Sequence, residues 1–270
     1  MGRIYGSNRI IGTVGGLRHY KMNNRDVIYV AETGGANKNL IMNNPAFDKT
    51  RRLMSEMKPR AYLAKAIKMN LGQWSKPIVN RYLIGAINAA LRKAQLKDTE
   101  SVKGTKSILL SKYRDVLNLP TYHWEQSLHD ILKCPYSVET GIDRKSISLS
   151  LTDFIPRELL KSPPEATHFQ FCLCIGVVCD YVFIPEHRKF EPVYSGTQMM
   201  SSMKELESEW IPVKEKQPYD LTFTVALPDS FQLEDDMTVL RCIGIVFGKN
   251  TYDMESLKYN RGSIEFLGAI

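Results

Sequence analysis

The chain has 270 residues, of which 43% are hydrophobic, and it carries 36 Lys and Arg against 29 Asp and Glu. A chain of this length and composition can bury one large hydrophobic core or two smaller ones. No segment approaches the roughly 18 consecutive apolar residues of a membrane-spanning helix, so no membrane span is predicted.

The charge is distributed unequally along the chain. Residues 1–120 hold 22 Lys and Arg against 7 Asp and Glu, a net charge of +15, whereas residues 121–270 hold 14 against 22, a net charge of −8. This asymmetry is consistent with nucleic-acid contact by the first part, or with electrostatic docking between the two parts. It is also consistent with the solvated faces of long helices, because Lys and Arg are good helix formers.

The segment GTVGGLRHYKMNNRDVIYVAE, residues 12–32, predicts a β-hairpin with a turn at 23–26. Its glycines match no phosphate-binding loop and no helix follows them directly, so they are expected to turn the chain. Neither hairpin face is wholly polar. The first strand alternates Leu17, His19 and Lys21 with Arg18, Tyr20 and Met22, and the second alternates Ile28 and Val30 with Val27, Tyr29 and Ala31. Because an isolated hairpin is marginal in water, the pattern favours packing on a partner subunit.

Three helical segments are predicted next. The first begins with Asn44 as N-cap and Pro45 at the first helical position, and extends to about residue 71. Pro59 predicts a kink or a break into two helices. The predicted apolar stripe consists of Phe47, Met54, Met57, Ala61, Ala64 and Leu71. The opposite surface is basic, and the candidate residues for contact with a partner or a polyanion are Arg51, Arg52, Arg60, Lys65 and Lys68.

A second helix is predicted over residues 76–96, and a shorter one over 107–117. One side of the second helix is formed by Val79, Leu83, Ala86, Ala90 and Ala94.

From Pro120 onward, hydrophobic residues alternate with period two. Runs at 146–151, 168–177, 220–225, 239–247 and 263–267 predict strands of an antiparallel sandwich, because no crossover helices separate them. One inner face is predicted to hold Phe169, Phe171, Leu173, Ile175 and Val177. The segment SSMKELESEW, residues 201–210, is expected to form a surface helix or a loop.

The five cysteines are expected to be reduced, and those at 172, 174 and 179 to be largely buried. Their odd number suits a reducing compartment, and Cys172 and Cys174 share one face of a strand. No Cys or His spacing matches a zinc site, and no calcium loop is present.

Several segments occur in order along the chain: the hairpin after GTVGG, NPAFDKTRR with the basic helix at 61–68, CPYSVETGIDRKSISLSL, SPPEATHFQF, the GIVFG strand and the terminal YNRGSIEFLGAI. Together they resemble an uncharacterised family of proteins from Bacteroidota. The resemblance covers most of the chain and implies the fold and a bacterial or bacteriophage-linked origin. Similar sequences continue as uninterrupted helix where this chain has Met57 and Pro59. The resemblance implies no activity and no catalytic residue.

The sequence therefore predicts an α+β fold, in which an N-terminal β-hairpin and helical region (1–120) precede an antiparallel β-sandwich domain (121–270). No nucleophile–base or acid–base pair can be nominated, so the predicted function is non-enzymatic. We expect a structural or interaction protein that assembles with itself or another protein, as part of a bacterial or phage-related particle. The alternative is non-specific nucleic-acid binding through the basic N-terminal helices.

No metal, cofactor or small-molecule substrate is predicted. The cysteine usage and the absence of a signal-peptide pattern predict a cytoplasmic protein, or a particle component that is assembled in the cytoplasm.

Overall fold

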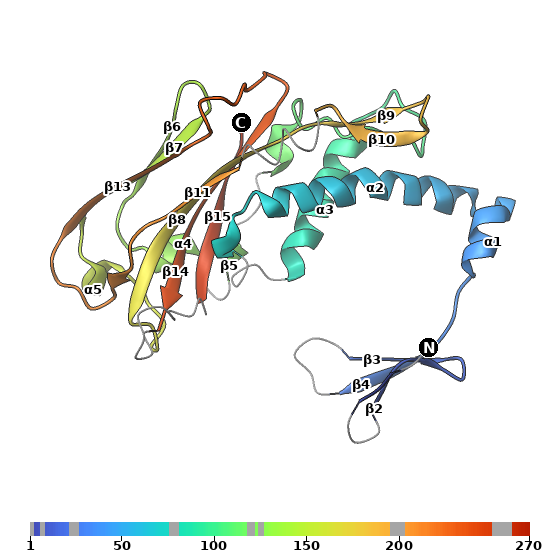
Figure 1. Ribbon diagram of the computed structural model, residues 1–270, viewed down its shortest axis with the longest axis horizontal. Helices are drawn as coiled ribbons and strands as arrows, with labels where there is room; N and C mark the ends of the chain where they lie inside the picture. Colours follow the sequence, from blue (N-terminus) through green and yellow to red (C-terminus); the bar gives the residue numbers. More distant parts are fainter. Residues whose placement is uncertain are drawn as a thin grey trace. The chain divides into compact units, whose positions relative to one another are not determined.

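The computed structural model describes residues 3–5, 9–21, 27–75, 81–117, 122–123, 127–194, 203–249 and 261–270. The elements confirm the predicted α+β fold with antiparallel sheets (Figure 1). The chain divides into two compact units, Met1–Arg51 and Arg52–Ile270, which we call the N-terminal and C-terminal units.

The N-terminal unit contains a four-stranded antiparallel meander. Strands β1 (Arg3–Tyr5), β2 (Arg9–Val14), β3 (Leu17–Lys21) and β4 (Ile28–Glu32) pair in sequence order. The predicted hairpin is confirmed as the β3–β4 pair, and β1 and β2 extend it into a sheet. Gly15 and Gly16 have φ of 58° and 80°, the left-handed conformation of a two-residue hairpin turn, so they turn the chain between β2 and β3. The predicted turn at 23–26 lies outside the described residues.

Helix α1 (Lys38–Asn43) and the 3-10 helix η1 (Pro45–Phe47) lead from this sheet to α2 (Asp48–Met69). Asn44 acts as an N-cap, as predicted, because its side-chain oxygen accepts a hydrogen bond from the backbone N–H of Ala46 at 2.9 Å. Helix α2 runs through Pro59 as one helix rather than two.

The predicted apolar stripe of α2 is largely wrong. Met54 and Met57 are 45% and 59% exposed, and of the predicted set only Ala64 and Leu71 are buried. The buried side chains of α2 are Glu56, Pro59, Leu63, Ala64 and Ile67. Both sets follow helical spacing: the predicted residues recur at intervals of three, four or seven, and the buried ones at intervals of three or four apart from the adjacent Leu63 and Ala64. The helical period alone therefore does not decide between the two faces.

Helix α3 (Arg81–Leu96) buries Leu83, Ala90 and Ala94 as predicted. Residues 76–80 of the predicted helix, which include Val79, lie outside the described residues. The helix predicted over 107–117 is reduced to the 3-10 helix η3 (Arg114–Leu117), because Ile108 forms a β-bridge with Tyr181. A further 3-10 helix, η2 (Gln73–Ser75), follows α2.

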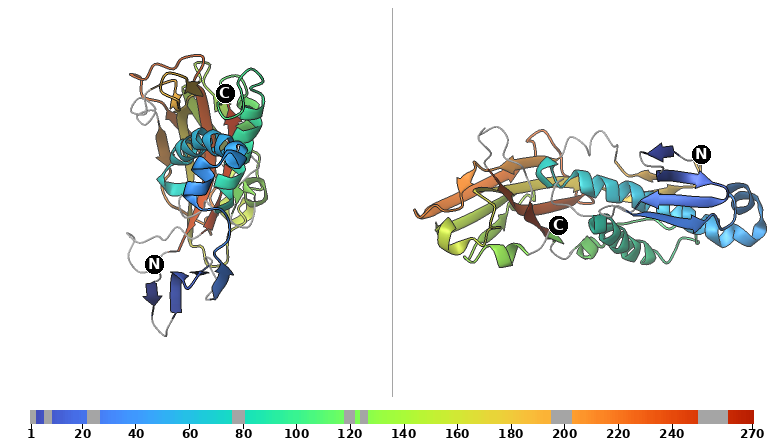
Figure 2. Two further views of the ribbon diagram at one scale, coloured as in Figure 1. Left: turned by 90° about the vertical axis from the view of Figure 1, so that its right-hand side faces the viewer. Right: turned by 90° about the horizontal axis from the view of Figure 1, so that it is seen from below.

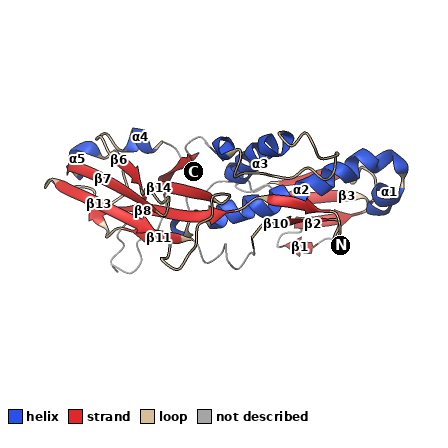
Figure 3. Cartoon of the chain, turned by 90° about the horizontal axis from the view of Figure 1, so that it is seen from above, coloured by secondary structure: helices blue, strands red, loops and turns tan. Residues whose placement is uncertain are grey.

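Two antiparallel sheets of the C-terminal unit pack face to face (Figure 3). The larger sheet has the order β11-β8-β14-β15-β5, with β12 beside β8, and the smaller sheet has the order β13-β7-β6. The strands of the larger sheet are β5 (Tyr122–His123), β8 (His168–Val178), β11 (Lys204–Glu207), β12 (Ile211–Pro212), β14 (Thr238–Gly248) and β15 (Arg261–Ala269). The smaller sheet comprises β6 (Ser137–Thr140), β7 (Ser146–Phe154) and β13 (Tyr219–Ala226).

A separate two-stranded ribbon consists of β9 (Tyr181–Ile184) and β10 (Lys189–Pro192), and two short helices are α4 (Leu128–Ile131) and α5 (Pro156–Leu159). The surface helix or loop expected at 201–210 is wrong in part, because residues 204–207 form β11 and pair with β8.

Strand β8 is the centre of two hydrophobic cores. The five side chains predicted to fill one inner face, from Phe169 to Val177, pack against the smaller sheet. Cys172 and Cys174 belong to the second core, on the opposite side of the strand, together with side chains of α2 and α3. The left view of Figure 2 shows these two helices in front of the strands of the C-terminal unit. The C-terminal unit is therefore layered, with the larger sheet between the smaller sheet and the helices.

The predicted domain boundary between residues 120 and 121 would separate helices and strands that share the second core. The second core joins Leu63 and Leu83 of the helices to Cys174 and Leu240 of the larger sheet. Because β8 and β14 are hydrophobic on both faces, the helices are needed to cover the sheet, and the compact units divide instead between Arg51 and Arg52.

Candidate functional site

The N-terminal sheet exposes apolar side chains. Val14 pairs with Leu17, and His19 pairs with Val30, so these four residues share one side, which we call the valine face. Val14, Leu17 and Val30 are 46%, 40% and 55% exposed. The opposite side, which we call the tyrosine face, holds Thr13, Arg18, Tyr20, Tyr29 and Ala31.

Aromatic and basic groups lie together on the tyrosine face. The rings of Tyr20 and Tyr29 stack with centroids 5.7 Å apart and an interplanar angle of 24°. The guanidinium carbon of Arg18 lies 6.0 Å from the Tyr20 ring centroid. Tyr20 remains 37% exposed, so the pair presents a flat aromatic surface beside a positive charge.

The N-terminal unit has no core of its own among the described residues. From residue 10 to residue 51, no described side chain is buried, and the buried hydrophobic residues that the structure describes begin at Leu63. Sheets gain independent stability by burying one face against another element. In the described part of this unit, neither face of the sheet is buried against another element.

Two of the five candidate basic residues serve the local fold. The Arg51 guanidinium donates hydrogen bonds to the carbonyl oxygens of Ile41 and Asn44, at 2.8 Å each, which ties α1 and η1 to the start of α2. Arg60 is half-buried and its Nε donates to the carbonyl oxygen of Glu56 at 3.2 Å. Burial and the neighbouring Arg92 lower the pKa of Arg60.

The other three candidates, Arg52, Lys65 and Lys68, are exposed. Arg52 and Lys65 are 13 positions apart in α2, which corresponds to about 20 Å along the helix axis. The structure therefore does not bring the five predicted residues into one basic patch. It does bring Lys65 and Lys68 to the rim of a cavity.

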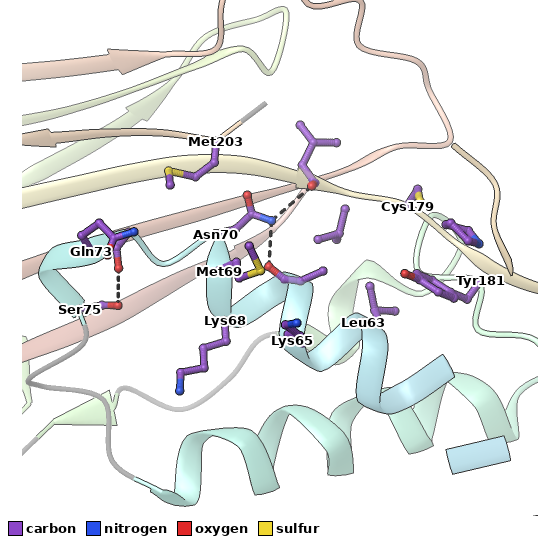
Figure 4. Close-up of a pocket in the computed structure, with 15 residues that line it drawn as sticks. Leu63, Lys65, Lys68, Met69, Asn70, Gln73, Ser75, Cys179, Tyr181 and Met203 are labelled. Carbon is purple, nitrogen blue, oxygen red and sulfur yellow. Dashed lines mark hydrogen bonds between the residues drawn. The ribbon is translucent and has the colours of Figure 1, made fainter. Parts of the chain in front are cut away.

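This cavity lies between the C-terminal half of α2 and the end of β8, and has a volume of about 640 Å³ (Figure 4). Most of its lining is apolar, with Leu63, Ala66 and Met69 from the helix and Val177 and Val178 from the strand. Its polar lining includes Asn70, Gln73, Ser75 and Tyr181. Sequence reasoning missed this site, since its two walls lie more than a hundred positions apart and share no motif.

The cysteines do not form a reactive site. All five are free and buried, which confirms the prediction for Cys172, Cys174 and Cys179. Burial raises the pKa of the thiols of Cys134, Cys172, Cys179 and Cys242. A thiol nucleophile needs the opposite shift. Among the described residues, no group of three His, Cys, Asp or Glu side chains is arranged to hold a metal ion.

The acidic turn at 234–236 is held by hydrogen bonds. Arg144 donates to the carbonyl oxygen of Glu234 at 3.2 Å, and Arg114 donates to the carbonyl oxygen of Asp235. The Tyr194 hydroxyl donates to the Asp236 carboxylate at 2.6 Å, which raises the pKa of Tyr194 to about 12. These contacts give the turn a structural role.

The fold and these surfaces define an α+β protein with a layered C-terminal unit and a small N-terminal sheet. Comparison with protein families, with curated proteins and with solved structures finds no match. None of the described helices combines the length and the apolar composition needed to cross a membrane.

Proposed function

We propose that the protein is a non-enzymatic structural or interaction protein that self-assembles through the valine face of its N-terminal sheet. The observation that carries this proposal is the lack of any buried side chain among the described residues from 10 to 51. A second copy supplies a matching cover, because two identical apolar faces are self-complementary across a two-fold axis. Sheets paired in this way pack about 10 Å apart.

The energy available from this face is modest. Full burial of a Val or Leu side chain contributes about 1.5–3 kcal/mol, so burying the remaining 40–55% of Val14, Leu17 and Val30 contributes about 1 kcal/mol each. Two copies together gain about 6 kcal/mol, against an association cost of about 4–15 kcal/mol. A pair held by this face alone is therefore weak, and its test requires concentrated protein.

The test compares charge insertions on the two sheet faces. Val14→Asp with Val30→Asp places two carboxylates on the valine face, and Thr13→Asp with Ala31→Asp places two on the tyrosine face, at exposed positions of the same strands. We expect the first pair to abolish self-association and the second to retain it, as measured by light scattering after nuclease treatment. Equal assembly of both variants would contradict the proposal.

A second candidate function is non-specific binding of single-stranded nucleic acid. The tyrosine face supports it, because stacked aromatic rings beside an Arg side chain suit base stacking and phosphate contact. The basic helices support it less, since their candidate residues are dispersed. Titration of a fluorescent single-stranded oligonucleotide at two salt concentrations tests this function. Binding that weakens with salt and with Tyr20→Ala supports it, and the absence of binding at low salt excludes it.

We place this self-association in a bacterial or phage-related particle that forms in the cytoplasm. Support comes from the sequence resemblance and from the five free cysteines, which suit a reducing compartment.

A further inference from the structure

The cavity beside α2 has the dimensions of a small-molecule site. Its volume of about 640 Å³ falls within the range of about 300–1,000 Å³ that is typical of ligand pockets. The site belongs wholly to the C-terminal unit, so it is independent of the assembly surface.

The interior combines apolar walls with two polar groups. The Tyr181 ring points its hydroxyl toward the cavity (Figure 4), and among the described residues this hydroxyl has no hydrogen-bond partner. The Asn70 side chain is 7% exposed, and its amide nitrogen donates to the carbonyl oxygens of Ala66 at 3.0 Å and Val177 at 3.4 Å. These bonds hold Asn70 between the helix and β8. Its Oδ1 packs against Gly176 of the strand, where an added Cβ atom would lie 2.1 Å from it.

The rim is positively charged. Lys65 and Lys68 both line the cavity, both are exposed, and neither forms an ion pair with a described carboxylate. Glu205, on the adjoining strand β11, accepts a hydrogen bond from the backbone N–H of Gln73 at 2.7 Å. The flexible stems of the lysines allow their ammonium groups to reach an anion at the cavity mouth.

We propose that this cavity binds a small amphipathic anion, with an apolar chain between α2 and β8 and a carboxylate or phosphate group at Lys65 and Lys68. The Tyr181 hydroxyl supplies a polar contact along the chain, and Asn70 holds the helix against β8 at the cavity wall. Apolar walls with a few placed polar groups are the general design of such sites.

The experiment uses the full-length protein and dodecanoate as the probe, titrated calorimetrically below its micelle concentration. Dodecyl phosphate distinguishes a phosphate from a carboxylate preference, and dodecanol is the neutral control. We expect dodecanoate, dodecyl phosphate or both to bind saturably at one site per chain, and we expect dodecanol to bind more weakly.

Charge reversal at the rim tests the position of the anionic group. Lys65→Glu with Lys68→Glu is expected to weaken anion binding about five- to tenfold, because each exposed ion pair contributes modestly. Lys49→Glu with Lys58→Glu changes the same charge at exposed positions of the same helix and is expected to leave the affinity unchanged.

A filled cavity tests the position of the apolar chain. Ala66→Phe inserts a ring into the lining and is expected to abolish binding, whereas Ala61→Phe on the exposed side of α2 is expected to have no effect. Thermal unfolding of each variant separates loss of the site from loss of the fold. Absence of saturable anion binding, equal binding of dodecanol, or full affinity in the Lys65→Glu, Lys68→Glu variant would each overturn the proposal.

Discussion

Replacement of Gly244 by Ala tests the packing of the helical layer on the larger sheet. Gly244 lies in β14, and a Cβ atom there would lie 2.5 Å and 2.6 Å from Cζ3 and Cη2 of Trp74 and 2.8 Å from the carbonyl oxygen of Ser263. Trp74 is 2% exposed, so it has little room to move. Because overpacking of a tight core costs about 1–3 kcal/mol, we expect Gly244→Ala to lower the free energy of unfolding by that amount.

Urea unfolding followed by tryptophan fluorescence measures this change, since all three tryptophans lie in the C-terminal unit. Gly85→Ala is the matched control. Gly85 lies inside α3 with no atom within 4 Å of the added Cβ, so this variant is expected to be more stable by about 0.5–1 kcal/mol.

A double variant isolates the cause. Trp74→Phe removes the two ring atoms nearest to the added Cβ, so Gly244→Ala is expected to cost about 1 kcal/mol less in that background. If Gly244→Ala leaves the urea midpoint unchanged, or if its cost is the same with and without Trp74→Phe, the packing of η2 on β14 is not as described.

Three further predictions concern buried polar groups. Unfolded protein is expected to show five free thiols in mass analysis after labelling, and any disulfide would contradict a reduced core. Because burial raises the folded-state pKa of Cys172 and Cys242, the contribution of these two thiols to stability is expected to be constant below pH 9.0. It is expected to fall as the pH rises above that value, where only the unfolded thiols ionise. Glu56 accepts a hydrogen bond from the Gly104 N–H at 2.7 Å within a buried site, so Glu56→Ala is expected to cost about 1–3 kcal/mol in urea unfolding. A smaller cost for Glu56→Gln is expected, and equal stability of Glu56→Ala and the parent would show that this bond is not formed.

The strands were predictable because their burial is local and periodic. In β8, alternate residues from Phe169 to Val177 enter one core, and the intervening Cys172 and Cys174 enter the other. A run that is apolar on both faces indicates a strand covered on both sides. The sequence did not show that the second cover is the helical region of the same chain.

The errors arose where a distant contact decides the outcome. The buried face of α2 contains Glu56, which no hydrophobic pattern selects, because its partner Gly104 lies 48 positions away. The charged run at 204–207 favours a helix or loop by composition, but the free edge of β8 pairs with it to form β11. The cavity is a further case, since it depends on how α2 and β8 meet. Such features follow from tertiary packing rather than from local propensity.

The most direct test of the proposed function is the mass of the nuclease-treated full-length protein over a wide range of concentrations. Sedimentation velocity combined with light scattering provides this measurement without a tag or a partner. We predict that the average mass rises with concentration above that of a single chain, and that the Val14→Asp, Val30→Asp variant remains at the mass of one chain throughout. A full-length protein that stays monomeric at the highest concentration would contradict self-assembly through the N-terminal sheet.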